Sequence, residues 1–199
     1  LAKKRQNWID ANRENDFEEG MQRWLAQQYP DNAHFIYELL QNAEDAHATH
    51  IYFRLEDNRF ITEHDGCPFT KENVKGITGI GNTTKSDQPN AIGKFGIGFK
   101  AVFQYTNTPE VYSYPFSFKI SDLVLPECLD SEDTSSKSVT RFVFPFDNPQ
   151  KEPDQAFDEI AEGLLELSVT TLLFLQNIKR ISWHIEPDID DYIERENSS

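Results

Sequence analysis

The stretch from Phe35 to Ala46, FIYELLQNAEDA, constrains the fold of this chain most, because it carries an apolar and a polar pattern together. Its apolar residues recur at the spacing of one helix face, at Phe35, Ile36, Leu39, Leu40, Ala43 and Ala46. Glu38 and Asn42 lie four residues apart and Asp45 lies one turn further, so these side chains share a second face. We therefore predict a helix that packs on a core and holds carboxylates and a carboxamide on a rigid element.

This polar stripe has a second interpretation, because the outer face of many packed helices is simply solvated. Two features further along the chain favour a functional site instead. They are the pair Asp65-Gly66, which ends a predicted strand pair, and the two glycine-rich loops that follow it.

The strand pair is predicted by two short β-prone runs, HIYFRL at residues 50–55 and RFITE at residues 59–63, with a turn between them. Pro68 lacks the N–H that a sheet ladder needs, so we expect Asp65 to lie where the second strand gives way to a loop. A short helix with Thr70 as its N-cap is expected next, over residues 70–76. His64 precedes Asp65 either by chance or for packing.

Seven of the nine glycines lie between Gly66 and Gly98, which indicates a loop with special backbone geometry. This loop leads into a predicted helix at residues 99–105, and the N–H groups at a helix N-terminus suit a phosphate. It is not a P-loop, because Phe95 follows Lys94 where that motif needs Ser or Thr. The glycine order of GKFGIG also excludes a dinucleotide fold.

The composition limits the partners of the chain. Its 199 residues suit one domain, and the formal net charge of −15 repels polyanions, so we expect no direct contact with nucleic acid. A small nucleotide remains acceptable, because backbone N–H groups and a divalent cation offset its charge. Cys67 and Cys128 form no CxxC motif, and no run spans a bilayer or reads as a signal segment. We therefore expect a cytoplasmic protein that contacts no membrane.

The rest of the chain is predicted to be scaffold around a domain at residues 31–186. A helical strap precedes it at residues 1–30, Asp31 or Asn32 is expected to cap the first helix of the domain, and an acidic polar tail or linker follows at residues 187–199. Further strands are expected at residues 110–114, 116–120, 139–146 and 178–185, a solvated loop at 130–138, and one long helix at 155–175.

The motifs occur in an order that resembles a known superfamily. Glu-x-x-x-Asn-x-x-Asp-Ala from Glu38, then Asp65-Gly66, then GKFGIGFKAVF, resemble the GHKL ATPases, which include gyrase, heat-shock chaperone, histidine kinase and MutL ATP-binding domains. The resemblance covers roughly residues 31–185. Glu38 argues against the histidine kinase branch, which lacks this glutamate. The segments GCPF, GIGNTTKS and LLFLQNIKRISW look most like sacsin-type N-terminal ATPase regions.

The resemblance implies a role for each matching residue. Glu38 matches the general base that activates the water attacking the γ-phosphate of ATP, and Asn42 matches the ligand of Mg²⁺. Asp65 matches the carboxylate that accepts from the adenine amino group, with Gly66 allowing the base to approach. The nucleotide is further expected to contact Asp45, Lys85, Thr140 and the phosphate-cradling loop of Gly93, Lys94, Phe95, Gly96, Ile97, Gly98 and Phe99.

Some features depart from the family pattern or stay open. Many members continue Asp-x-Gly-x-Gly, but here Pro68 and Phe69 follow Cys67, so the adenine-side loop differs and the lid behaviour of those members does not transfer. Lys85 and Lys100 either reach the phosphates or lie in solvent. In the chaperone and gyrase branches a Lys or Arg of the next domain reaches the γ-phosphate, so we expect slow hydrolysis by this chain alone.

These expectations give one predicted architecture, an α+β two-layer sandwich with helices on one face of a mixed, mostly antiparallel sheet and a glycine-rich ATP lid. The predicted function is Mg²⁺-dependent ATP binding and hydrolysis within a larger protein, with the nucleotide state driving lid closure. An ATP-sensing interaction module with little hydrolysis, and an ATPase of a DNA-linked or antiviral-defence machine, stay open. The expected partners are ATP or ADP, downstream domains of the same polypeptide, and a second copy of the chain.

Overall fold

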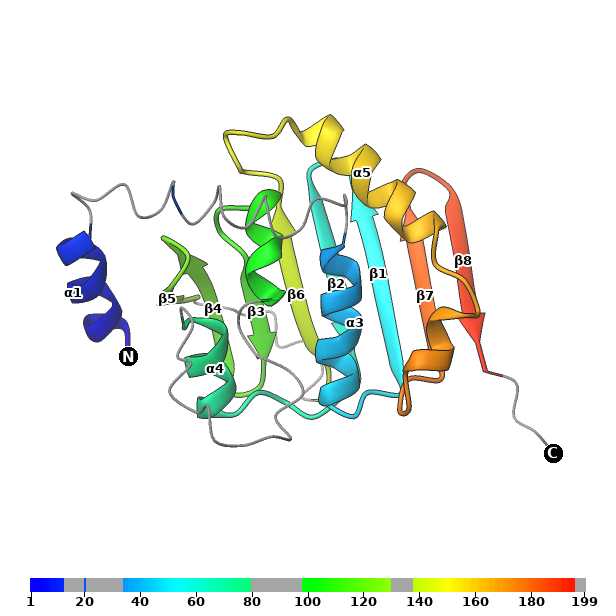
Figure 1. Cartoon of the computed structure of the whole chain (residues 1–199), viewed down its shortest axis with the longest axis horizontal. Coiled ribbons are helices and arrows are strands. Elements are labelled where there is room, and N and C mark those ends of the chain that lie inside the picture. The colour runs from blue at the N-terminus through cyan, green and yellow to red at the C-terminus, as the bar shows by residue number, and fades with distance from the viewer. Residues whose placement is uncertain (13–19, 21–33, 80–97, 130–137, 196–199) are drawn as a thin grey trace.

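The structure is a computed structural model, and it describes residues 1–12, 20, 34–79, 98–129 and 138–195. Within these residues one eight-stranded sheet runs across the molecule in the order β5-β4-β3-β6-β2-β1-β7-β8 (Figure 1). Only β1 and β7 pair parallel among the described strands, so the sheet is mixed and mostly antiparallel, as expected. The strands are β1 (His50–Glu56), β2 (Arg59–His64), β3 (Glu110–Ser113), β4 (Phe116–Ser121), β5 (Leu125–Cys128), β6 (Thr140–Pro145), β7 (Arg180–Ile185) and β8 (Ile189–Glu194).

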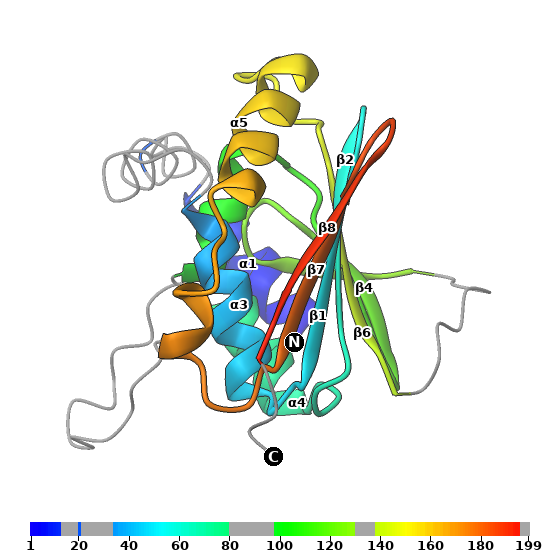
Figure 2. The same ribbon diagram turned by 90° about the vertical axis from the view of Figure 1, so that its right-hand side faces the viewer.

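The helices lie on one face of the sheet, which gives the molecule two layers (Figure 2). Helix α3 (Phe35–Asp45) lies in front of β2, and α5 (Pro153–Leu165) runs across the upper ends of β1 and β7 (Figure 1). The predicted α+β sandwich is therefore confirmed, whereas the predicted glycine-rich lid lies outside the described residues. The remaining helices are α1 (Ala2–Asn12), α4 (Lys71–Ile77) and the 3₁₀ helices η2 (Gly98–Gln104) and η3 (Thr171–Phe174).

The core forms between the sheet and α3. Phe35 of α3 meets Phe60 of β2 edge-on, with 5.7 Å between ring centroids, and Phe60 stacks on Phe53 of β1 and Phe144 of β6. All four rings are at most 2% exposed. Since each buried Phe contributes about 2 kcal/mol, this cluster fixes α3 against the centre of the sheet.

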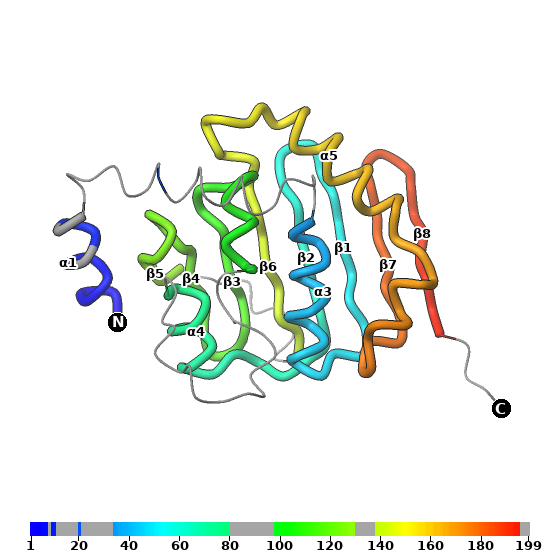
Figure 3. The backbone as a smooth tube through the Cα atoms, viewed as in Figure 1, coloured from blue at the N-terminus to red at the C-terminus, as the bar shows by residue number. Residues whose placement is uncertain are grey.

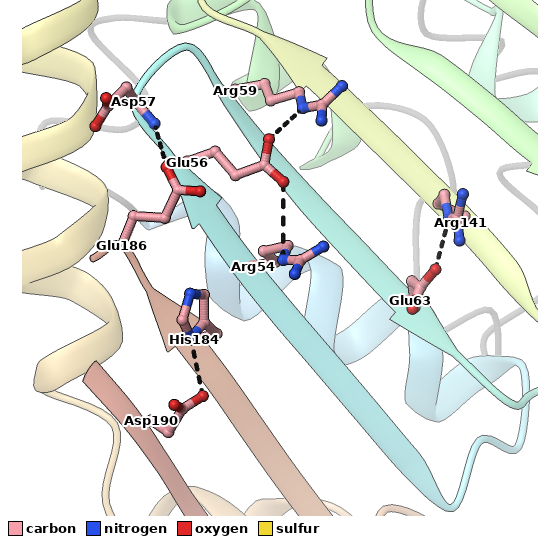
Figure 4. A network of polar contacts seen from close by, with 9 residues as sticks. All are labelled: Arg54, Glu56, Asp57, Arg59, Glu63, Arg141, His184, Glu186 and Asp190. Carbon is pink, nitrogen blue, oxygen red and sulfur yellow. Dashed lines mark hydrogen bonds and ion pairs between the residues drawn. The ribbon is translucent and has the colours of Figure 1, made fainter. Parts of the chain in front are cut away.

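The other face of the sheet carries polar side chains. The carboxylate of Glu56 on β1 lies 3.7 Å from Arg54 Nε and 2.6 Å from Arg59 Nε (Figure 4). The carboxylate of Glu63 on β2 lies 2.5 Å from Nε of Arg141 on β6. The strands alternate between these residues and buried apolar ones, as in β1, where Ile51, Phe53 and Leu55 face the helices. This alternation explains why the helices cover one face only.

The predicted hairpin and the helix after it are confirmed. β1 and β2 pair antiparallel over the two β-prone runs, from Ile51 opposite His64 to Glu56 opposite Arg59. Helix α4 starts after Thr70, whose hydroxyl accepts from the N–H of Asn73. Figure 3 follows the chain from β2 along the lower edge of the molecule into α4.

One prediction about the scaffold was wrong. The long helix at 155–175 ends as α5 at Leu165, and a separate turn, η3, follows. Between them the Ser168 hydroxyl contacts that of Thr170 at 2.7 Å, and such local side-chain hydrogen bonds compete with a continuing helix. The helix predicted at residues 99–105 is present as the 3₁₀ helix η2, one residue earlier, whereas strand β5 was not predicted.

The acidic segment from residue 187 also differs from the predicted tail. Its residues Ile189–Glu194 form β8, which pairs antiparallel with β7 and makes the sheet one strand wider. Arg180 of β7 holds this strand, because its guanidinium lies 4.2 Å from the Tyr192 ring and 3.7 Å from the Glu194 carboxylate. The predicted caps Asp31 and Asn32 lie outside the described residues, and α3 begins after His34 without a side-chain cap.

Candidate functional site

A pocket of about 160 Å³ opens between α3, α4, the loop after β2 and strand β6. Part of its lining is apolar and comes from Phe69, Ile77 and Phe142. The remaining lining residues are Asn42, Asp45, Ala46, His64, Cys67, Pro68, Thr70 and Asn73. The pocket therefore combines apolar surface with a few polar groups, the usual character of a small-molecule site.

Two residues of the predicted polar stripe lie in this pocket wall. Asn42 is half-buried, and its carboxamide has no hydrogen-bond partner within the described part of the chain. Asp45 is exposed, and its Oδ1 accepts from the Gln41 side chain at 2.9 Å. The carboxamide of Asn42 is thus available to a ligand.

Glu38, one turn before Asn42, lies against the first residue of η2. A Cβ atom built on Gly98 would sit 1.8 Å from Glu38 Oε2 and 2.5 Å from its carboxyl carbon, so only glycine leaves room for this carboxylate. The glycine at residue 98 is therefore explained by its neighbour on α3.

Asp65 holds the corner between α3 and β1. Its Oδ1 accepts from the backbone N–H of Thr49 at 2.7 Å and of His50 at 2.9 Å, and its Oδ2 accepts from the Thr49 hydroxyl at 2.6 Å. Burial raises the pKa of the Asp65 carboxyl, but these hydrogen bonds together outweigh it, so the pKa lies below its ordinary value. Asp65 is consequently a carboxylate at neutral pH, and one lone pair of Oδ2 stays available.

Gly66 allows the loop after β2 to approach α3. A Cβ atom at this residue would lie 2.7 Å from the Ala46 carbonyl oxygen and 2.9 Å from the Ala46 Cβ. The same carbonyl accepts from the Cys67 N–H at 2.7 Å. Residue 66 must therefore be glycine because the loop passes so close to the end of α3. This close approach also places Cys67 in the pocket wall.

His64, for which the sequence offered only chance or packing, lines the pocket and is 4% exposed. Its Nδ1 accepts from the Gly66 N–H at 3.1 Å. Burial lowers the pKa of the His64 imidazole to about 4, so the ring is neutral at physiological pH. The hydrogen bond from Gly66 needs an unprotonated Nδ1, so this contact in the loop after β2 is compatible with the neutral imidazole.

Thr140 is fully buried and reaches the pocket through its neighbours. Its Oγ1 lies 2.6 Å from Ser113 Oγ, which accepts from the N–H of the pocket residue Phe69 at 2.8 Å. Thr140 therefore supports the wall of the pocket and is not itself among the lining residues.

Phe99 and Lys100 both point into the protein. Phe99 is 2% exposed and packs on the rings of Phe142 and Phe144. Lys100 is 5% exposed, and its Nζ donates to the carbonyls of Ile77, at 2.8 Å, and Leu123. Neither alternative considered for Lys100, a phosphate contact or a solvated side chain, agrees with this burial.

The other predicted contacts of the nucleotide lie outside the described residues. They are Lys85, Gly93, Lys94, Phe95, Gly96 and Ile97.

The pocket also contains residues that the sequence did not single out. Asn73, Ile77 and Phe142 come from α4 and β6, and no local motif marks them. His64 carried a weak signal, because it alternates with Thr62 on the buried face of β2 and directly precedes Asp65.

The described residues fit a divalent cation in only one way. They contain no group of three or more His, Cys, Asp or Glu side chains suited to hold a metal ion. Mg²⁺, however, commonly binds through one or two protein oxygens together with water and phosphate oxygens. The unpaired carboxamide of Asn42 fits such a ligand.

In the described part of the chain, no helix is long and apolar enough to cross a membrane.

Sequence comparison relates the central part of the chain to sacsin-type proteins. Residues 61–143 match the Sacsin domain family. The chain is 36% identical over 121 residues to Protein NO VEIN of Arabidopsis thaliana, covering 55% of this chain and 4% of that protein. It is 32% identical over 106 residues to Sacsin of Homo sapiens, covering 45% of this chain and 2% of that protein. The chain thus spans a small fraction of either relative.

Structure comparison identifies the same fold in a solved protein. A crystal structure of the N-terminal domain of a DNA repair protein superposes with a TM-score of 0.56 over 88% of this chain and 56% of that one. The sequences are 12% identical, so this likeness concerns the fold alone. The chain is therefore similar in sequence to the Sacsin domain and in fold to a DNA repair protein domain.

Proposed function

We propose that this chain is an ATP-binding and ATP-hydrolysing domain of a larger protein. The observation that carries the proposal is the course of α3, which holds the Glu38 carboxylate against Gly98 and places Asn42 and Asp45 in the wall of the adjacent pocket. A carboxylate at the exit of a glycine-rich segment, one turn from a carboxamide, suits the hydrolysis of a phosphate anhydride. The resemblance to GHKL ATPases and the similarity to the Sacsin domain support the same assignment.

Six residues of the site take roles in the proposed binding and hydrolysis of ATP. Glu38 accepts a proton from the water that attacks the γ-phosphate. Asn42 would hold Mg²⁺, which offsets phosphate charge when bound. Asp65 offers the remaining lone pair of Oδ2 to the amino group of the base. Phe69, Ile77 and Phe142 supply apolar surface for the base.

The experiment that tests this proposal separates binding from turnover. Glu38→Gln keeps the size of the side chain and removes its basicity, so calorimetric titration with Mg²⁺-ATP should give the wild-type Kd. Single-turnover hydrolysis should fall by about 10² to 10⁴-fold, the usual contribution of general-base catalysis. Glu162→Gln, a change of the same type at an exposed position of α5, is the control and should leave both quantities unchanged. An unchanged rate in Glu38→Gln would contradict the assignment.

One observation favours a second function, an ATP-sensing interaction module with little hydrolysis. The described lining of the pocket includes no lysine or arginine, although a cation near the γ-phosphate usually stabilises the transition state. Single-turnover assays of the intact parent protein distinguish the two functions. Tight Mg²⁺-ATP binding without product above background favours sensing, and product formation that depends on Glu38 favours an ATPase.

A further inference from the structure

His64 occupies an unusual place for an ionisable side chain, because it lines the pocket and is 4% exposed. Its tautomer follows from one contact. The backbone N–H of Gly66 can only donate, and it lies 3.1 Å from His64 Nδ1, so Nδ1 is the acceptor. A neutral imidazole with an accepting Nδ1 carries its proton on Nε2. His64 therefore presents one fixed donor, the Nε2–H group.

This donor has no acceptor among the described residues. The recorded contacts of His64 are the hydrogen bond from Gly66, the Phe142 ring at 6.2 Å and the nearby charge of Asp65. Nε2 is not among the fully buried unpaired side-chain atoms of the described residues, so water reaches it in the unliganded protein. A ligand that excludes this water must supply an acceptor in its place, because a donor left unpaired lowers the affinity. The pocket thus contains a polar group that matches an acceptor on a bound molecule.

The surroundings of His64 define the chemistry of that acceptor. Phe69, Ile77 and Phe142 line the same pocket and favour a flat apolar body over a charged group. An acceptor embedded in a flat, mostly apolar body is a ring nitrogen of an aromatic heterocycle. The neutral state of His64 also suits such a nitrogen, because an uncharged acceptor needs no charged donor.

We propose that His64 is a specificity-determining residue, whose Nε2–H donates to a ring nitrogen of the purine base of the nucleotide. This inference rests on the proposed function, because it assumes that the pocket binds the base of ATP. It adds a base contact on the residue before Asp65, from a side chain that no sequence motif marks. The protein then selects its nucleotide through a donor as well as through the Asp65 carboxylate.

The test uses ATP analogues that each lack one ring nitrogen, namely 1-deaza-, 3-deaza- and 7-deaza-ATP. Calorimetric titration of the unmodified chain with Mg²⁺ and each analogue should show one analogue that binds about tenfold or more weakly than ATP, because it excludes water from the donor and offers no acceptor in return. The other two analogues should bind about as well as ATP. This series needs no mutation, so it does not depend on how a variant folds.

Two variants complete the test. His64→Phe keeps an aromatic ring and removes the donor, so it should bind ATP and the discriminated analogue with equal affinity. Glu63→Gln changes the neighbouring residue on the opposite face of β2 and should keep the wild-type discrimination. If the unmodified chain binds ATP and all three analogues equally, the inference about His64 is overturned while ATP binding stands. A calorimetric titration that shows no binding of ATP itself overturns both the proposed function and the inference about His64, so the two failures are distinguishable.

Discussion

The carboxylate of Glu38 and the backbone of Gly98 lie in direct contact, so close that a side chain at residue 98 would overlap Glu38 Oε2. One residue belongs to α3 and the other begins η2, so a single contact joins the proposed catalytic helix to the end of the glycine-rich segment. The position of the Glu38 carboxylate therefore depends on the size of the side chain at residue 98.

Gly98→Ala should therefore act as an indirect mutation of Glu38. The added methyl group displaces the carboxylate, because the flexible end of the glutamate side chain is what lies within 1.8 Å. We expect single-turnover ATP hydrolysis to fall by about 10²-fold or more, as in Glu38→Gln. The double variant should be no slower than either single variant, because the two changes remove the same function. Additive losses in this double-mutant cycle would contradict the relationship.

Lys100 should make the stability of the protein depend on alkaline pH. Burial, with a smaller effect from the charge of Arg5, lowers the pKa of the Lys100 amine to about 7 from 10.5. The unfolded chain binds the extra proton between these values, so the free energy of unfolding should rise by up to about 1.4 kcal/mol per pH unit above pH 7. Urea denaturation at pH 7, 8 and 9 measures this slope, with Lys100→Met as the comparison.

Lys100→Met should lose that slope and also lower stability. The amine donates to the carbonyls of Ile77 and Leu123, and each buried carbonyl without a donor costs about 1–3 kcal/mol. A variant that is as stable as the wild type at every pH would show that Lys100 is not buried as described.

His64 should make the protein sensitive to acid. The folded state holds the imidazole neutral with a pKa of about 4, whereas the unfolded chain protonates it near 6.5. The unfolded state thus binds more protons between these values, so stability is complete above pH 6.5 and falls as the pH drops toward 4. The loss approaches about 3 kcal/mol. Denaturant titrations at pH 7 and pH 4.5 measure it, and His64→Phe should show a smaller difference between them.

Glu44 should be the glutamate of α3 that matters most for stability. Its carboxylate is 8% exposed and accepts from the backbone N–H groups of Gln176, Asn177 and Ile178 at 2.8–3.0 Å. Glu44→Ala leaves these donors unpaired in a partly buried loop, so we expect a loss of about 3 kcal/mol in the free energy of unfolding. Glu38→Ala, a matched truncation on the same helix, should cost far less. Equal costs would contradict this division of roles.

The sequence predicted those parts of the fold whose signals are local. The apolar spacing of α3 and the two β-prone runs of the hairpin lie within single elements, so they could be recognised from periodicity alone. Strands β5 and β8 could not, because LPEC contains a proline and IDDYIE is acidic. Their strand conformation comes from pairing with β4 and β7.

The candidate site was predictable to a similar extent. Periodicity placed Asn42 and Asp45 on one face, but it could not separate Glu38, which meets Gly98, from Glu44, which binds the loop before β7. Lys100 comes directly after the glycine-rich segment, where a ligand of the phosphates is expected. Its amine is instead buried, because it donates to the carbonyls of Ile77 and Leu123 from distant segments. Such contacts between remote residues carry no local sequence signal.

The hydrogen bonds around the pocket bear on how a ligand is received. Cys67 is bound to the end of α3, Phe69 is held through Ser113 to β3, and Ile77 is tied to Lys100. These walls are anchored to different elements, so their mutual spacing is set before any ligand arrives. Binding then requires little ordering of these groups, which keeps the entropic penalty of association small. We therefore expect the shape of this part of the pocket to act as a rigid template, against which a mismatched ring is rejected.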